Sequence, residues 1–410
     1  MKKITLFSTL LVAGLVGSQL LPAWLGSAYA AVAEAVRFLT MFGLAFIMIH
    51  VGYEFELDQS QVRSLGKDYG VAMTTAAFPW IIAALYFMYL LLPAAEWGNW
   101  TTWKELILAG RFAAPTATGI LFSMMAAAGL SATWTFRKTR ILAIFDDLDT
   151  VLLMIPLKML MIGLAWQLGF IVVVMAVLLA VGWRGLHRLR LPVSWPWVLG
   201  YAFAIAAASE FIYQFTKLID DNVPVHIEVL LPAFVLGCVI QRPAGCNPHC
   251  DDAREGHQEG PESPVEQRVS TIVSAVFMVL VGLSMPVFIG SAALAPAGGA
   301  ATVTAAQPPL SPGTLVVHVV VLTLLINIGK LFPAFCYRRE AHWRERLAVA
   351  VGMCPRGEVG AGIILLSLSY GIGGPVVAVA VLSLALNLVL TPVFVAAVNH
   401  LVRTTPPVRV

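Results

Sequence analysis

The sequence predicts an all-α, polytopic membrane protein with about twelve transmembrane helices. Hydrophobic residues make up 59% of its 410 residues and charged residues 12%, whereas soluble domains carry about 25% charged residues. The mean hydropathy is +0.83. A soluble core could not absorb so much apolar sequence, so most of the chain should lie in lipid.

The helices are taken from apolar runs of roughly 20 residues, the length needed to cross a bilayer. These runs lie near 4–25, 33–53, 69–92, 105–128, 140–161, 163–183, 194–217, 225–241, 269–290, 314–337, 347–371 and 375–402.

Basic residues support this count independently, because cytoplasmic connections are enriched in lysine and arginine. They collect in the termini and in every second connection, and only Lys104 and Lys217 lie clearly in the other connections. Both termini should therefore be cytoplasmic. The net charge of +3 reflects this orientation and does not indicate a nucleic-acid partner.

The N-terminus and the loops leave two points open. Residues 1–30 also resemble a signal peptide with a small-residue cleavage site, although a retained first helix is favoured. The polar loop 242–268 reads as a cytoplasmic linker. Its Cys246 and Cys250 could bind a metal ion, but a solvated loop is the preferred interpretation. The five cysteines of the chain do not indicate a disulfide framework.

Three carboxylates lie inside the apolar run 140–161, at Asp146, Asp147 and Asp149. Each charge costs at least ~2.5 kcal/mol at the centre of a membrane helix, so charged residues there usually mark a functional site. Asp146 and Asp149 lie one turn apart on one helix face. Such a cluster needs cations nearby, either fixed or exchangeable, which predicts that the chain binds or moves a cation.

Other charged residues in apolar runs are candidates for fixed counter-ions or ion pairs. Lys330 and Arg356 could neutralise the aspartates, and Glu358 could pair with Arg356 to stabilise broken backbone. A buried network that only fixes helix register is the alternative. We expect Lys158, Glu105 and Arg111 to lie near a membrane interface. The sequence leaves two roles possible for Glu210 and Glu228: lining a passage for ions, or lying near a helix end.

Two runs are interrupted where a continuous helix would be expected, at Pro115 within 114–119 and at Pro355 with Gly357. Irregular backbone at membrane depth is tolerated where it is buried in protein or lines a cavity. The two runs are the fourth and eleventh, each in the middle of a triplet. We therefore expect inverted repeats over approximately 69–161 and 314–402, within one transporter domain covering 1–410.

Several short motifs resemble those of the cation/proton antiporter superfamily, specifically bacterial sodium/proton antiporters with a double-aspartate motif. They are the segments 50–57, 232–237 and 355–358 (Pro-Arg-Gly-Glu), the pair Asp146-Asp147, and Gly329-Lys330. The resemblance covers nearly the whole chain. It implies that broken helices 4 and 11 cross, that Asp147 carries cation and proton, that Asp146 pairs with Lys330, and that the protein forms a homodimer.

Two departures from the family pattern leave the cation open among sodium, potassium and lithium. The helix 4 break reads Thr116-Ala117-Thr118, where relatives often carry an aspartate, and Asp149 is an extra acid. Asp147, and Asp149 as a second candidate, would bind Na⁺. The Thr116 and Thr118 hydroxyls could add oxygen ligands, which suit a hard cation.

The sequence thus predicts a secondary antiporter in the bacterial inner membrane that exchanges protons for a monovalent cation, sodium first, by alternating access. Membrane lipid, cations and protons are its expected partners, and no cofactor is needed. A potassium/proton antiporter is the nearest alternative. A magnesium-dependent intramembrane enzyme is weaker, because the spacing is Asp-Asp-x-Asp and no second aspartate-rich motif follows. A non-transporting sensor is the third.

Overall fold

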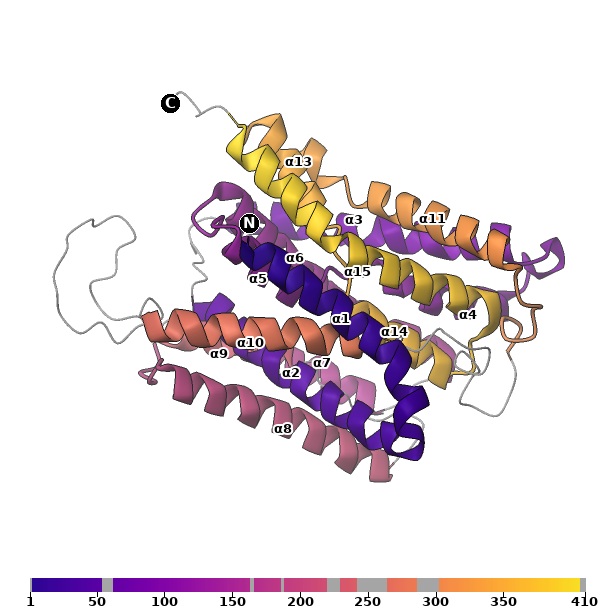
Figure 1. Cartoon of the computed structure of the whole chain (residues 1–410), viewed down its shortest axis with the longest axis horizontal. Coiled ribbons are helices and arrows are strands. Elements are labelled where there is room, and N and C mark those ends of the chain that lie inside the picture. The colour runs from indigo at the N-terminus through magenta and orange to yellow at the C-terminus, as the bar shows by residue number, and fades with distance from the viewer. Residues whose placement is uncertain are drawn as a thin grey trace. The chain divides into compact units, whose positions relative to one another are not determined.

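The structure, a computed structural model, is helical through the residues it describes (Figure 1). These are residues 2–53, 62–162, 166–185, 188–219, 229–241, 264–285 and 302–405. An isolated bridge between Leu189 and Ile240 is the one extended pairing within them. The predicted all-α class is confirmed.

The helices follow the predicted runs in order. The first group is α1 (Lys2–Leu25), α2 (Tyr29–Tyr53), α3 (Val62–Tyr86), α4 (Trp100–Gly110), α5 (Thr118–Ala127), α6 (Trp134–Ile162), α7 (Trp166–Gly185) and α8 (Trp195–Ile219). The second is α9 (Leu230–Val239), α10 (Pro264–Leu283), α11 (Pro312–Gly329), α12 (Pro333–Cys336), α13 (Trp343–Gly352), α14 (Glu358–Ser369) and α15 (Gly374–Arg403).

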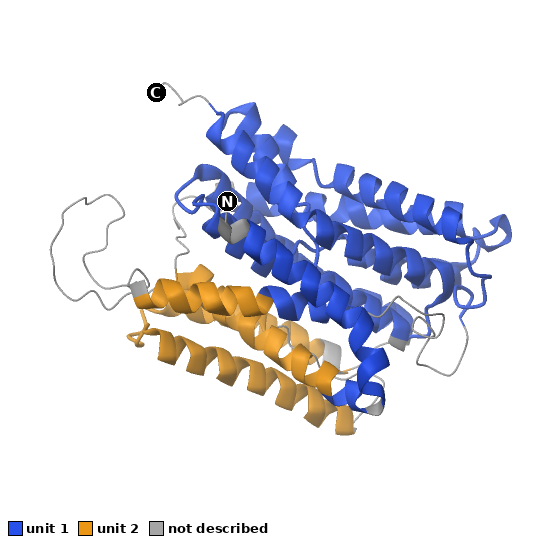
Figure 2. Ribbon diagram, viewed as in Figure 1, with its two compact units in different colours: residues 1–31, 60–163, 278–410 blue, residues 32–59, 164–277 orange. Residues whose placement is uncertain are grey.

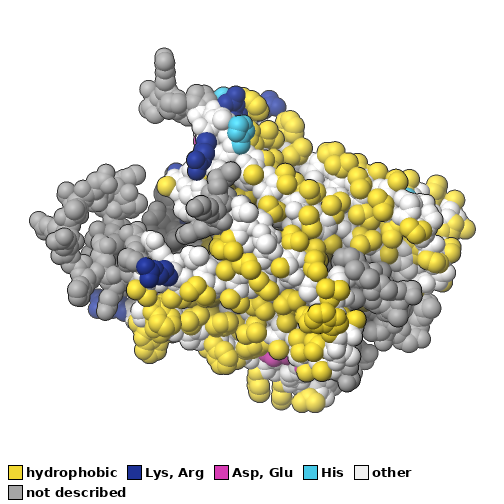
Figure 3. All heavy atoms as spheres, viewed as in Figure 1, with side chains coloured by type: hydrophobic (Ala, Val, Ile, Leu, Met, Phe, Trp, Pro, Cys, Tyr) yellow, Lys and Arg dark blue, Asp and Glu magenta, His cyan; other side chains and the backbone are white. Residues whose placement is uncertain are grey.

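Within the described residues, eight helical segments are long and apolar enough to cross a membrane. They lie in α1, α2, α3, the α4–α5 pair, α8, α10, the α11–α12 pair and α15. Helix α6 is not among them, because every 18-residue stretch of it contains Asp146, Asp147 and Asp149. Apolar side chains cover most of the face in Figure 3, as expected for a surface in contact with lipid.

The chain divides into two compact units (Figure 2). Unit 1 comprises residues 1–31, 60–163 and 278–410, and unit 2 comprises residues 32–59 and 164–277. All eight sequence-predicted site residues belong to unit 1. Glu228, Cys246 and Cys250 lie outside the described residues.

In unit 1, α3 packs against α6 and α11, and α15 packs against α1, α11 and α13. Helix α1 contributes Phe7 and Leu11 to this packing, with 2% and 0% of their surfaces exposed. The apolar face of α1 is thus buried within the unit, as in an integral helix.

In unit 2, α9 packs against α7 and α8, and α2 crosses α9 closely. A Cβ atom on Gly52 would lie 2.2 Å from the Phe234 carbonyl oxygen, so only glycine permits this approach. Glu210 on α8 accepts hydrogen bonds from Arg37 on α2 at 2.7 and 2.8 Å. Glu210 is therefore held in a local ion pair between two helices.

Both sequence-predicted helix interruptions are present. Helix α4 ends at Gly110 and is followed by a 3-10 turn, Arg111–Ala113, before α5 begins at Thr118. Helix α13 ends at Gly352 and α14 begins at Glu358. A third interruption corrects the continuous run expected over 314–337: α11 ends at Gly329, because the ring of Pro333 would clash with the preceding turn.

A charged cluster ties the starts of α3 and α6 to the turn after α12. Lys138 lies 3.1 Å from Asp68 and 3.3 Å from Glu340, and Lys67 lies 2.6 Å from Glu340. The Tyr337 hydroxyl donates to Asp68 at 2.8 Å. Partial burial raises the pKa of Glu340, but the Lys67 hydrogen bond and the Lys138 charge outweigh it and hold this pKa below its usual value.

Candidate functional site

The two interrupted helices meet through their irregular segments. The Ala117 N–H donates to the Pro355 carbonyl at 2.8 Å, and the Thr116 hydroxyl lies 3.2 Å from the Met353 carbonyl oxygen. A Cβ atom on Gly357 would lie 3.2 Å from the Ala117 Cβ atom, so a larger residue would push the segments apart. Non-helical backbone of unit 1 is therefore satisfied by other backbone rather than by lipid.

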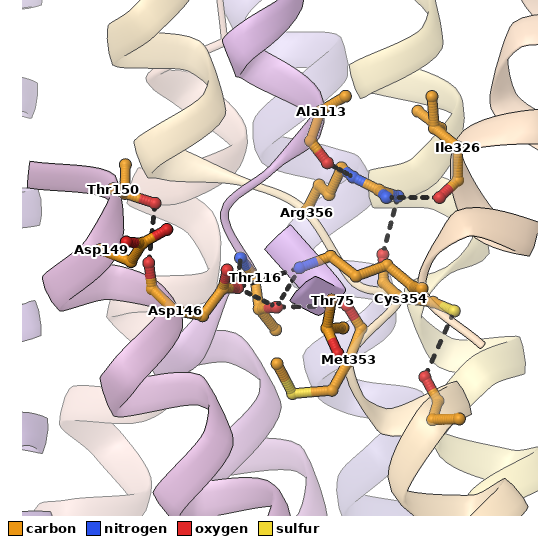
Figure 4. Close-up of polar contacts among 12 residues, drawn as sticks. Thr75, Ala113, Thr116, Asp146, Asp149, Thr150, Ile326, Met353, Cys354 and Arg356 are labelled. Carbon is orange, nitrogen blue, oxygen red and sulfur yellow. Dashed lines mark hydrogen bonds and ion pairs between the residues drawn. The ribbon is translucent and has the colours of Figure 1, made fainter. Parts of the chain in front are cut away.

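Asp146 and Lys330 form an ion pair beside this junction. Figure 4 shows Asp146 next to Thr116. The Lys330 Nζ atom lies 3.0 Å from Asp146 Oδ2, and both side chains are 0% exposed. Asp146 Oδ2 also accepts from the Thr116 N–H at 2.9 Å and from its hydroxyl at 2.7 Å. Because one carboxylate oxygen accepts from Lys330, directly after α11, and from the α4–α5 break, Asp146 joins both to α6.

Thr116 is already committed to this ion pair, whereas Thr118 is not. The Thr116 hydroxyl donates toward Asp146 and accepts from Lys330 at 3.2 Å. Thr118, the first residue of α5, is 0% exposed, and its hydroxyl has no hydrogen-bond partner among the described residues. Of the two predicted threonine ligands, Thr118 therefore has the hydroxyl available for a bound ion.

Asp147 follows Asp146 on α6 and is 4% exposed. Consecutive helix positions are rotated by about 100°, so its side chain leaves the helix in a different direction from that of Asp146. Within the described residues, no group of three or more His, Cys, Asp or Glu side chains has the arrangement to hold a metal ion.

Asp149 lies against Arg111, which corrects the expectation that Arg111 reaches a membrane interface. The Arg111 Nη2 atom donates to the Asp149 backbone carbonyl at 3.1 Å and lies 3.7 Å from its carboxylate. Arg111 is 0% exposed. Glu105, expected in the same place, is 3% exposed and accepts from the Thr304 hydroxyl at 2.9 Å. Both residues have polar partners inside unit 1, which removes the need to reach water.

Arg356 binds backbone carbonyl oxygens, as Figure 4 shows for Ala113, Ile326 and Cys354, and also a side-chain amide oxygen. Its guanidinium, also 0% exposed, donates to the carbonyls of Ala113 at 2.7 Å, Ile326 at 3.0 Å and Cys354 at 3.1 Å, and to the Asn327 amide oxygen at 2.7 Å. These acceptors lie at interruptions or near the end of α11, where helix carbonyls lack intrahelical partners. Glu358 begins α14, and its side chain lies outside the described part of the structure.

The described ionisable side chains of this site balance in charge. Three acids, Asp146, Asp147 and Asp149, lie in α6, and three buried bases accompany them: Lys330, Arg111 and Arg356. When all six are ionised, their formal charges cancel. This balance lowers the cost of burying charge at membrane depth, because uncompensated ions there are expensive.

Sequence reasoning missed Arg111 as a site residue, and it missed the role of Asn327. Arg111 carried the same signal as the aspartates, a charge inside the apolar run 105–128. Asn327 carried a weaker one, a lone amide in an apolar run. It donates to the Asn387 amide oxygen on α15 at 3.1 Å while accepting from Arg356.

Comparison with known proteins identifies the family to which the chain belongs. No curated protein matches it. A family model described as "Sodium/hydrogen exchanger, transmembrane" matches residues 2–398. Because this match covers nearly the whole chain, the protein belongs to the sodium/hydrogen exchanger transmembrane family, whose members are cation/proton antiporters and not enzymes.

Proposed function

We propose that this protein is a secondary antiporter of the double-aspartate type that exchanges protons for a monovalent cation, with sodium the first candidate, by alternating access. Family membership implies cation/proton exchange and leaves the cation open. It also removes the intramembrane enzyme considered from the sequence. The observation that carries the proposal is the charge balance of the buried cluster in unit 1.

Charge balance couples the two ions. A cation that enters a neutral buried cluster leaves an excess positive charge unless a proton departs. Lys330 can release a proton, whereas the guanidinium groups of Arg111 and Arg356 stay charged. When Lys330 releases its proton, the arriving cation replaces its charge. Cation uptake and proton release are then two halves of one exchange.

Each residue takes a distinct part in this proposal. Asp147 carries either the cation or a proton, and the Thr118 hydroxyl and carbonyls of the helix breaks complete the oxygen shell. Asp146 and Thr116 hold Lys330. Arg356 keeps the interrupted segments together. The resemblance of residues 355–358 to a family motif supports adding Glu358 to the coupling groups, as an acid beyond the six described side chains whose charges cancel.

We further propose twelve crossings within one transporter domain, with inverted repeats over 69–161 and 314–402. Each repeat contains one of the two interrupted helices whose backbones are hydrogen-bonded, which supports this assignment. Crossing of these helices follows from the same symmetry. The packing of α1 against α15 supports a retained first helix.

Both termini should be cytoplasmic, and the protein should lie in the bacterial inner membrane as a homodimer in contact with lipid. Thr5, near the start of α1, and Arg403, at the end of α15, line one surface cavity of unit 1. The two helix ends therefore lie on one side. The distribution of lysine and arginine along the sequence makes that side cytoplasmic.

The test is a proteoliposome assay with an internal pH dye, challenged in turn with sodium, lithium and potassium. We expect proton flux driven by sodium. Flux with potassium alone would identify the potassium/proton antiporter instead. A protein that moves no protons with any of the three salts would contradict the proposal and leave a non-transporting sensor as the better account.

A further inference from the structure

We propose that Arg111 and Asp149 form a positioning pair that sets cation selectivity, and that Asp149 is not itself a ligand of the transported cation. This inference rests on the proposed function. It departs from the sequence-based expectation, in which Asp149 is a second candidate to bind Na⁺.

Arg111 is held from two sides. Its guanidinium carbon lies 4.7 Å from the centre of the Trp80 ring on α3, within the range of a cation–π contact. Trp80 is itself fixed, because its indole N–H donates to the Ile107 carbonyl on α4 at 2.7 Å. On the other side, Arg111 Nη2 contacts the carbonyl and carboxylate of Asp149.

This environment requires a nearby anion. Arg111 is fully buried, and its Nε and Nη1 atoms have no hydrogen-bond partner among the described residues. A buried guanidinium with few hydrogen bonds is stable only if a counter-charge compensates it. The Asp149 carboxylate, 3.7 Å away and 3% exposed, is the acid in contact with it. The Asp149 carboxylate therefore supplies the charge that compensates Arg111, which leaves it a poor carrier of exchanging ions.

The Arg111–Asp149 pair lies at the break between α4 and α5. Arg111 begins the 3-10 turn on the α4 side of the break, and Thr116 lies on its α5 side. Arg111 is bound to Asp149, while Thr116 is bound to Asp146 one turn earlier on α6. Asp146 and Asp149 are three residues apart, a rise of about 4.5 Å along the helix. Two residues of a single helix thus hold the two arms of the break, at Arg111 and at Thr116, at a fixed separation: Asp149 through its backbone carbonyl and a 3.7 Å ion pair, and Asp146 through its carboxylate.

This separation determines where the irregular segment between the arms lies. Carbonyl groups of such a segment lack helical partners and can coordinate an ion. Small monovalent cations differ in radius and in the oxygen spacing they accept, so a shift of one arm changes which cation binds best. The Arg111–Asp149 pair would therefore act on selectivity through the backbone, without touching the cation.

The test is a double-mutant cycle with Arg111→Met, Asp149→Leu and both together, read by melting temperature and by proteoliposome exchange. Each single variant strands a buried charge, so its melting temperature and exchange should both fall. The double variant should recover most of the melting temperature and regain exchange, with the ratio of apparent KM for sodium and potassium shifted at least threefold. The Arg111→Lys variant, which keeps the charge and loses the planar fork, should shift the ratio in the same direction.

The matched control is Lys330→Met with Asp146→Leu, an equivalent pair in the coupling machinery. It should recover melting temperature without recovering exchange. Additive losses of melting temperature in the Arg111 and Asp149 cycle would overturn the pairing. A tenfold rise in KM for every cation in the double variant would make Asp149 a ligand and overturn the positioning role. Failure of the wild type to exchange any cation would refute the proposed function, whereas the melting cycle would still report on the pair.

Discussion

The Lys330→Ala variant tests the buried ion pair most directly. Lys330 and Asp146 are both 0% exposed, so removing the lysine leaves a carboxylate buried without its cation. Breaking such a pair from one side costs about 3–5 kcal/mol. Thr116 would still donate two hydrogen bonds, at 2.9 and 2.7 Å, which places the expected loss near the lower figure.

A loss of about 3 kcal/mol is a large fraction of the roughly 5–15 kcal/mol by which proteins are stable. It should appear as a clear fall in melting temperature of the detergent-purified protein near neutral pH. The double change Lys330→Ala with Asp146→Asn removes the stranded charge and should recover much of this loss. Lys217→Ala, on an exposed position of α8, is the control and should leave the melting temperature unchanged.

The result that would refute this reasoning is a melting temperature of Lys330→Ala equal to that of the wild type from acid to alkaline pH. Asp146 would then not depend on a fixed cation. A loss in the double variant as large as in the single one would also count against the pair. In that case the cost would come from the cavity left by the lysine side chain rather than from charge.

Three further predictions concern the carrier, the coupling ratio and pH. Asp147→Asn keeps the side-chain volume and removes the titratable charge, so sodium-driven proton flux should fall to background in a protein that still melts cooperatively, and normal flux would remove Asp147 from the carrier role. If Lys330 and Asp147 both exchange protons against one cation, transport carries net charge and should respond to a clamped potential, worth ~2.3 kcal/mol per charge per 100 mV, whereas insensitivity would show one-for-one exchange. The Glu340 carboxyl has a folded pKa below its usual 4.5, so its stabilisation is present above that value and is lost as pH falls through the folded pKa. Melting curves of wild type and Glu340→Gln should differ at neutral pH and converge in acid, and a constant difference would show that Glu340 acts through something other than its charge.

Much of the fold can be predicted from the apolar runs in the sequence and from the prolines that interrupt them. Runs of apolar residues predict helices because backbone in lipid must be satisfied within its own segment. Pro115 and Pro355 predict the two interruptions because proline removes a donor and clashes with the preceding turn. The same rule applies at Pro333, yet the run over 314–337 reads as one helix, because its average hydropathy stays high across the turn after Gly329.

The partners of buried charges could not be predicted in the same way. Hydropathy reports the cost of placing a charge in lipid, but not which group compensates it. Asp146 and Lys330 are 184 positions apart. The residue types indicated Lys330 as one of two possible counter-ions, and the specific pairing with Asp146 was expected from a family resemblance. Arg111 and Asp149 are 38 positions apart, and no family motif indicated that they pair. Three acceptors of Arg356 are backbone carbonyls, which every residue type carries, so the sequence could not identify them.

The three buried bases differ in chemistry in a way that fits a division of roles. Arginine keeps its charge under all ordinary conditions and has a planar fork of donors, so it suits the fixed contacts that Arg356 and Arg111 make with carbonyls and with Asp149. Lysine presents a single ammonium group, which can lose a proton when its surroundings become more positive. The lysine of this cluster contacts Asp146, the neighbour of the proposed carrier. A cation arriving at Asp147 would therefore act first on the one base among the three that can respond by releasing a proton. An arginine at position 330 would keep the ion pair and lose that response, so Lys330→Arg should melt like the wild type while its exchange becomes insensitive to membrane potential. Potential-dependent exchange in that variant would show that the second proton comes from another group.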